Sequence, residues 1–297
     1  MTPDWWEAFV GRFEAALGRV RINAGELVDI VDSHEFAKGR APRSPGGHPW
    51  WAILTVAGLA IVLSYLLLDE PVARGLRQIG GDPTGFFRAI TDLGLAVWYL
   101  VPTGIVVVVA AISEPLRVVD RASARIATFV GRAAFLFVSV GGISLAVGIL
   151  KRAIGRARPK LIETLGAHDF SPFSIDGAFA SLPSGHATTI GALAVALGLM
   201  LPRWRLVFWF LGALVALSRV MVGAHYPSDV IAGLLIGGLA TWLLAAWAAR
   251  RRLVFQVAAD GTIRTRGRRL LRRPAAFGSA LAGLLRRMTR SLRGQSA

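Results

Sequence analysis

Three short clusters of polar residues interrupt a mostly apolar sequence, and their residue types suit chemistry at a phosphate group. In chain order they read Lys151-x6-Arg158-Pro159, Pro183-Ser184-Gly185-His186 and Ser218-Arg219-x5-His225-x3-Asp229. Phosphoryl transfer requires a nucleophile, a proton donor and positive charge around the equatorial oxygens. The clusters contain a candidate for each of these roles, so we treat them as one predicted site.

Cationic side chains in the clusters predict a binding site for phosphate oxygens. Lys151, Arg158 and Arg219 carry positive charge, and the planar fork of arginine matches the geometry of a phosphate. Ser184 stands where it would cap a helix, and Gly185 lets an anion approach the free amides of that helix start. Helix capping and phosphate contact are equally good interpretations of Ser184, because one hydroxyl can do both.

Two histidines and a carboxylate predict how the phosphoryl group is moved. His225 can attack phosphorus, Asp229 can orient its ring and stabilise the developing positive charge, and His186 can protonate the leaving oxygen. The resulting intermediate is a phosphohistidine, which water hydrolyses. The chain has no cysteine, which excludes a thiolate nucleophile and thiolate metal ligands.

The elements that carry these clusters are predicted to be membrane-spanning helices. Hydrophobic residues make up 54% of the 297-residue chain, and the mean hydropathy is +0.54. A helix needs about 20 apolar residues to cross the hydrocarbon core. Six segments meet or approach this length, at residues 50–68, 93–113, 133–150, 182–201, 206–224 and 230–249. We therefore predict an all-α bundle of six spans over residues 50–249, in which the intramembrane Arg219 marks a functional site.

Positive charge in the loops predicts the orientation of the bundle. Cytoplasmic loops carry an excess of lysine and arginine, and a cytoplasmic N-terminus places four basic segments on that side, at residues 38–43, 117–125, 203–205 and 250–293. Both termini are then cytoplasmic, and the three clusters meet at the outer face of a bacterial-type inner membrane. The basic segment 151–160 falls on the disfavoured side, which an anionic substrate would explain. Within it, we interpret Arg152, Arg156 and Lys160 as interfacial anchors.

The two ends of the chain, residues 1–49 and 250–297, lie outside the predicted bundle. Apolar residues recur at helical spacing over 6–20 and 277–292, which predicts helices lying on the inner leaflet, with charged, disordered termini as the alternative. The tail holds thirteen arginines and one acidic residue, Asp260. We expect this tail to bind anionic inner-leaflet lipids rather than nucleic acid, because no nucleic-acid-binding module accompanies the arginines.

Other polar residues near the clusters receive no catalytic role. The outer loop 69–92 carries aromatic and basic residues, and we interpret it as an amphipathic connector rather than a lid. The loop residues His168, Asp169 and Asp176 are assigned nothing beyond a contribution to substrate selection.

The three clusters match the motifs K-x6-R-P, P-S-G-H and S-R-x5-H-x3-D, and on these residues the chain resembles the type 2 phosphatidic acid phosphatase superfamily over roughly residues 50–249. The resemblance implies a six-helix membrane bundle and catalysis without a metal or cofactor. It implies His225 as nucleophile, His186 as general acid and Asp229 as the partner that orients the nucleophile. The implied substrates are undecaprenyl diphosphate, phosphatidic acid, phosphatidylglycerol phosphate or the phosphate of a lipid A-type glycolipid. The predicted spans argue against the soluble vanadium haloperoxidases of the same superfamily.

Two other functions stay open at this point. A lipid phosphotransferase would pass the phosphoryl group from the same histidine to a lipid acceptor instead of water. A non-catalytic membrane protein would only bind anionic lipid through its arginine-rich tail. Phosphate release without an acceptor separates hydrolysis from transfer, and activity without the tail separates both from simple binding. The sequence makes no prediction of oligomeric state.

Overall fold

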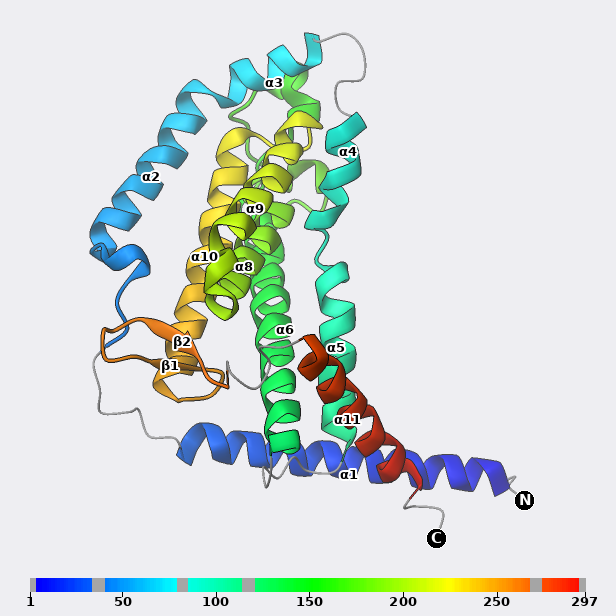
Figure 1. The fold of residues 1–297 in the computed structure, drawn as a ribbon. Helices are drawn as coiled ribbons and strands as arrows, with labels where there is room; N and C mark the ends of the chain where they lie inside the picture. Colours follow the sequence, from blue (N-terminus) through cyan, green and yellow to red (C-terminus); the bar gives the residue numbers. More distant parts are fainter. Residues whose placement is uncertain (1–3, 34–40, 79–84, 114–120, 268–273, 294–297) are drawn as a thin grey trace. The chain divides into compact units, whose positions relative to one another are not determined.

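Helices form almost all of the secondary structure in the computed structural model, which describes residues 4–33, 41–78, 85–113, 121–267 and 274–293 (Figure 1). In chain order they are α1 (Asp4–Ser33), α2 (Trp50–Leu67), α3 (Asp69–Gln78), α4 (Gly85–Thr91), α5 (Val97–Ile112), α6 (Arg121–Ile154), α7 (Ile162–Leu165), α8 (Gly185–Met200), α9 (Arg205–Met221), α10 (Pro227–Arg250) and α11 (Pro274–Arg293). The strands β1 (Phe255–Val257) and β2 (Ile263–Thr265) pair antiparallel. The predicted all-α class is confirmed, with this short hairpin as an addition.

The helices include the expected membrane spans. Within the described residues, five segments are long and apolar enough to cross a membrane: Trp50–Leu67, Gly85–Ile112, Arg121–Ile154, Pro202–Met221 and Pro227–Arg250. The helix Gly185–Met200 is apolar but shorter, with 16 residues. These six segments correspond in order to the six predicted spans. The third is longer than predicted, because α6 continues for twelve residues before Ala133 through a segment that contains arginines.

The chain divides into two compact units, each of which uses separate stretches of sequence. The first unit comprises Met1–Pro42, Val101–Phe135 and Ala246–Ala297, and the second comprises Arg43–Leu100 and Leu136–Ala245. The helices α5, α6 and α10 each contribute residues to both units. All three predicted motif clusters belong to the second unit.

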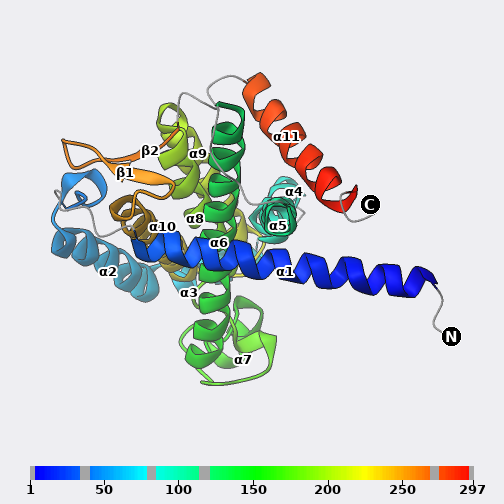
Figure 2. The same ribbon diagram turned by 90° about the horizontal axis from the view of Figure 1, so that it is seen from below.

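Close helix packing in the second unit holds the start of α8 in place. Helix α8 packs against α9 (Figures 1 and 2). It also meets α10 through glycines: a Cβ on Gly233 would overlap the carbonyl oxygen of Ser184, and one on Gly237 would overlap that of Thr188. Small residues let membrane helices approach at backbone distance. The N-terminal turn of α8 is therefore fixed against the N-terminal turns of α10.

In the first unit, helices form at both ends of the chain, as the apolar spacing predicts. The helix α1 is tied to the end of α5, because Asn23 donates hydrogen bonds to the carbonyls of Ala111 and Ser113 at 2.6 and 3.1 Å. One face of α11 buries Leu284 against a cluster that includes Ile126 of α6. The hairpin is anchored similarly, through Phe255, which packs edge-on against Phe135 with ring centroids 4.7 Å apart. The location of these helices on the inner leaflet stays a prediction.

Candidate active site

The first motif cluster leaves the end of α6 in an extended segment held between two parts of the following loop. Gly155 turns the chain with a φ of +69° in a place where a Cβ would collide with the backbone of Ser171, so only glycine suits this turn. The next residues are then fixed by backbone hydrogen bonds, from the amide of Ala157 to Asp169 and from the amide of Arg158 to Ala178, at 3.0 and 2.9 Å. The loop thereby sets the positions of the basic residues of this motif.

The second motif starts α8 as the sequence predicts. Ser184 caps the helix, its hydroxyl accepting a 3.4 Å hydrogen bond from the amide of Ala187. Its own amide donates to the backbone oxygen of Asp229 at 3.0 Å, which joins the second motif to the third. A Cβ on Gly185 would meet no atom within 4 Å. The helix start therefore borders open space, where an anion can approach the free amides.

The third motif brings His225 next to Asp229. Nδ1 of His225 lies 3.7 Å from Oδ2 of Asp229, and both side chains are buried. This distance is longer than a hydrogen bond, and Nδ1 is buried without a hydrogen-bond partner among the described residues. The carboxylate is nevertheless firmly held, since the same Oδ2 accepts hydrogen bonds from the Ser181 hydroxyl at 2.6 Å and the Tyr226 amide at 3.0 Å. The other ring nitrogen, Nε2, is not part of this contact.

Positive charge converges on His186, the histidine of the second motif. The side chains of Lys151, Arg158, Arg219 and His225 all lie close enough to His186 to act on its half-buried ring electrostatically. The three motif clusters, which are separated by up to 78 positions in the sequence, therefore meet at one place.

Two further groups border His186 and the adjacent cation Arg219. The turn Asp92–Gly94 approaches His186 so closely that a Cβ on Gly94 would lie 2.8 Å from Cδ2 of the ring. Arg219 donates from Nη1 to the hydroxyl of Thr91 at 2.8 Å, which holds its guanidinium beside this turn.

The environment of His225 favours the neutral ring that a nucleophile requires. Burial lowers the pKa of the imidazole, because the charged form loses solvation. The carboxylate of Asp229 opposes this effect, whereas the cations Arg158 and Arg219 add to it. The net result is a lowered pKa, so the ring is unprotonated at neutral pH.

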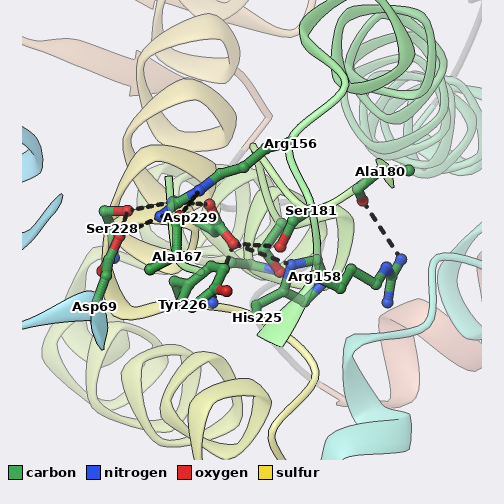
Figure 3. A network of polar contacts seen from close by, with 12 residues as sticks. Asp69, Arg156, Arg158, Ala167, Ala180, Ser181, His225, Tyr226, Ser228 and Asp229 are labelled. Atoms are coloured by element: carbon green, nitrogen blue, oxygen red, sulfur yellow. Dashed lines mark hydrogen bonds and ion pairs between the residues drawn. The ribbon is translucent and has the colours of Figure 1, made fainter. Parts of the chain in front are cut away.

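The interpretation of Arg156 as an interfacial anchor is wrong. Its side chain is completely buried, and its guanidinium lies between Asp69 and Asp229 at 2.7 Å from an oxygen of each (Figure 3). It also donates to the Ser228 hydroxyl at 2.8 Å and, from two nitrogens, to the carbonyl of Ala167 at 2.9 and 3.3 Å. All five N–H donors of the guanidinium thus have acceptors. Arg152 and Lys160, the other two proposed anchors, are exposed.

Sequence reasoning also missed Asp69, Ser181 and Ser228, which complete the surroundings of Asp229. Asp69 lies 87 positions before Arg156, in the loop that we interpreted as a connector. One signal was available: Asp69 is an acidic residue that follows directly on the apolar segment 50–68. A carboxylate at a span end near a basic cluster invites a search for its partner.

Two polar residues of the loop between α6 and α8 stay peripheral to the contacts of Arg156 and Asp229. His168 is exposed and meets the backbone oxygen of Tyr65 at 3.1 Å, and Asp176 is exposed and caps a short turn at Ala178. In the part of the chain that the structure describes, no three His, Cys, Asp or Glu side chains gather to form a metal site.

The apolar helices define the chain as an integral membrane protein, and comparison with known proteins gives its family. The model of the PAP2 superfamily matches residues 132–253. The lipid A 1-phosphatase of Rhizobium etli is 39% identical over 71% of this chain and 90% of its own length, and that of Rhizobium johnstonii is 38% identical over 74% and 90%. The undecaprenyl-diphosphatase of Sulfolobus acidocaldarius is 46% identical, but over 23% of this chain and 29% of its own length. The chain belongs to the PAP2 superfamily and is a membrane phosphatase of that family.

Among solved structures, the transmembrane PAP2-type phosphatidylglycerolphosphate phosphatase of Bacillus subtilis is similar over 64% of this chain and 92% of its own, at 22% identity. The TM-score of this similarity is 0.42.

Proposed function

We propose that this protein hydrolyses the phosphate ester of a membrane lipid through a phosphohistidine formed on His225. The observation that carries the proposal is the placement of Asp229 beside Nδ1 of His225 at 3.7 Å, next to a group of cations that can receive a phosphate. A carboxylate on one side of an imidazole directs the opposite nitrogen toward the substrate and stabilises positive charge on the ring.

The proposed reaction has two steps. Nε2 of His225 forms a bond to phosphorus while the bond from phosphorus to the lipid oxygen breaks, and that oxygen takes a proton from His186. A water molecule then attacks phosphorus, gives its proton to His186 and releases inorganic phosphate from the histidine. Lys151, Arg158 and Arg219 neutralise the phosphate oxygens in both steps, together with the amides at Ser184 and Gly185.

The proposed chemistry is metal-independent, because the cationic side chains supply the charge that a metal ion would otherwise provide. A strong chelator should therefore leave the rate of phosphate release unchanged. Loss of activity in chelator, restored by added metal, would contradict this part of the proposal.

The 1-phosphate of lipid A is the substrate that we propose first. The two rhizobial relatives named for that activity match this chain over 90% of their own length, whereas the archaeal undecaprenyl-diphosphatase matches over 71 residues. A long match includes the loops that contact the rest of a substrate, and a short one covers mainly the phosphate motifs. Undecaprenyl diphosphate, phosphatidic acid and phosphatidylglycerol phosphate are the competing substrates.

The deciding experiment is a phosphate-release panel over these four lipids with detergent-solubilised protein. The proposal predicts steady release from one lipid, lipid A first, and none with His225→Ala. An activity that needs a lipid acceptor would instead identify a phosphotransferase. An intermediate labelled from ³²P-substrate should be labile in acid, as phosphohistidine is, and should be absent in His225→Ala.

We also propose that the site opens to the outer face and that both termini are cytoplasmic. The absence of cysteine from the chain allows a clean test, since a single introduced cysteine has no background. The exposed Thr164, near the site, and the exposed Gln256, in β1, are suitable positions. An impermeant maleimide should label Thr164→Cys in intact cells and Gln256→Cys only after permeabilisation. The reverse pattern would overturn the orientation.

The helix α11 supports a proposed contact between the tail and anionic lipid. Its Leu284 is buried in the protein, but Leu285, Arg286 and Arg290 are exposed. Such a surface combines apolar area with positive charge and suits an anionic membrane surface. Vesicles containing phosphatidylglycerol should bind a peptide of residues 274–293 more strongly than its Arg286→Gln/Arg290→Gln version, and equal binding would contradict the proposal.

A further inference from the structure

A second buried carboxylate, Asp69, is linked to Asp229 through the guanidinium of Arg156. Its Oδ2 accepts hydrogen bonds from Arg156 at 2.7 Å and from the Ser228 hydroxyl at 2.5 Å. Its Oδ1 accepts from the Ser228 amide at 2.9 Å. Neither carboxylate oxygen is left without a donor, although the side chain is completely buried.

The contact with Ser228 gives Asp69 a geometric role at the start of α10. The first amides of a helix have no partner within the helix, and the amide of Ser228, the second residue of α10, is satisfied by Asp69. The next residue is Asp229. Asp69 therefore holds the turn of backbone from which the catalytic carboxylate projects.

Charge counting in this buried cluster shows a second role. Asp69, Arg156 and Asp229 form two ion pairs around one guanidinium, both at 2.7 Å (Figure 3). The three groups together carry a net charge of one negative unit. If Asp69 were uncharged, Arg156 would neutralise Asp229 completely, and no net negative charge would face the ring of His225.

The rings of two tyrosines reinforce the position of the guanidinium. The central carbon of Arg156 lies 4.3 Å from the centroid of the Tyr226 ring and 4.9 Å from that of Tyr65. An arginine in contact with two aromatic rings, and with every donor satisfied, has little freedom to move toward one carboxylate. The sharing between the two acids is therefore set by the fold.

We propose that Asp69 is a positioning residue of the active site, which shares Arg156 so that Asp229 keeps a net negative charge for His225. The inference rests on the proposed role of His225 as the nucleophile. Asp69 itself does not touch the substrate. It acts through Arg156 and Ser228, and it balances the charge on which the stabilisation of phosphohistidine depends.

The other charged groups around Asp229 and His225 stay the same in every variant of the test. Asp229 faces Arg156 on one side and His225 on the other. The ring of His225 also faces Arg158 and Arg219 and interacts with the ring of His186. Changes at Asp69 or Arg156 alter the charge behind Asp229 and leave these groups in place.

The test measures the acidic limb of the pH profile of kcat/KM in variants that change this charge in opposite directions. Asp69→Asn keeps an oxygen for the Ser228 amide and removes one negative charge, so the limb should move to lower pH by about one unit, the order expected for one charge inside a protein. Arg156→Gln removes one positive charge and should move the limb to higher pH. The double variant restores the net charge, and its limb should return toward the wild-type position. All three should lower kcat/KM at least tenfold.

Ser228→Ala is the matched control, because it breaks hydrogen bonds of the same cluster without changing any charge. It should lower activity and leave the limb in place. A purely structural role for Asp69 would give losses of activity with unmoved limbs in every variant, or shifts of the same sign for Asp69→Asn and Arg156→Gln. Either result overturns the inference. If Asp69→Asn does not fold by itself, the double variant is compared with Arg156→Gln. Removal of the Asp69 charge should place the acidic limb of the double variant at lower pH than that of Arg156→Gln, and equal limbs would overturn the inference.

Failure of this inference is distinguishable from failure of the proposed function. Activity in His225→Ala would refute the nucleophile and with it the proposed function. If His225→Ala is inactive but the acidic limb of the pH profile is unmoved in the Asp69 and Arg156 variants, only the role of Asp69 is refuted.

Discussion

The carboxylate of Asp229 carries the most direct quantitative prediction, because its distance to His225, the proposed nucleophile, is known. Oδ2 lies 3.7 Å from Nδ1 of His225, and both groups are buried. Replacement by asparagine keeps the shape and removes the charge that stabilises the ring as it becomes positive. At 3.7 Å and an effective dielectric constant of about 20, one pair of unit charges interacts by about 4.5 kcal/mol.

This interaction energy is an upper bound on the effect of removing the charge, since Arg156 also binds Asp229 at 2.7 Å and already offsets part of its charge. A barrier raised by roughly 3 to 4 kcal/mol corresponds to a loss of about 10² to 10³ in kcat. We therefore expect Asp229→Asn to lower kcat by this factor. The assay is steady-state phosphate release from the best lipid of the substrate panel, with thermal unfolding measured in parallel.

Asp176→Asn is the matched control for this variant. Asp176 is an exposed acid of the same unit, and its hydrogen bond from the Ala178 amide can be kept by the asparagine oxygen. Its kcat should stay within about twofold of wild type, as for most surface substitutions. A folded Asp229→Asn protein that retains more than a fifth of wild-type kcat would refute the assigned role of Asp229.

Further predictions concern the groups around the two histidines. Burial lowers the pKa of His225, and a nucleophile must be unprotonated, so activity should persist as the pH falls until it reaches this lowered pKa. The acidic limb of the pH profile of kcat/KM should therefore lie below pH 6.5, and a limb above that value would contradict the assignment. Arg219→Lys keeps the charge but loses the planar fork, so kcat/KM should fall about 10- to 100-fold, mainly through KM, and an unchanged KM would argue against phosphate contact. Gly94→Ala places a methyl group 2.8 Å from the His186 ring. The displaced ring should lower kcat about 10²-fold while the protein stays folded, and a wild-type kcat would show that the position of this ring is unimportant.

Much of the site was readable from the sequence because its motifs are local. Ser184 caps α8 and His225 lies four residues before Asp229, so short-range spacing was enough to predict which residues share a helix end. The apolar segments were equally readable, since a stretch long enough to cross a bilayer has a strong compositional signal. That four helix ends meet on one side followed from the alternation of spans.

The tertiary structure decided the partners of the buried charges. The sequence alone presents Arg156 as one of several basic residues after a span. Its burial becomes visible only when the following loop places the carbonyl of Ala167 against it and the start of α10 supplies Ser228. The pairing with Asp69 spans 87 positions, and no periodicity links residues so far apart. Spacing along a chain reports which side chains share an element. The pairing of one buried charge with another depends on contacts between elements, and these contacts exist only once the helices have packed.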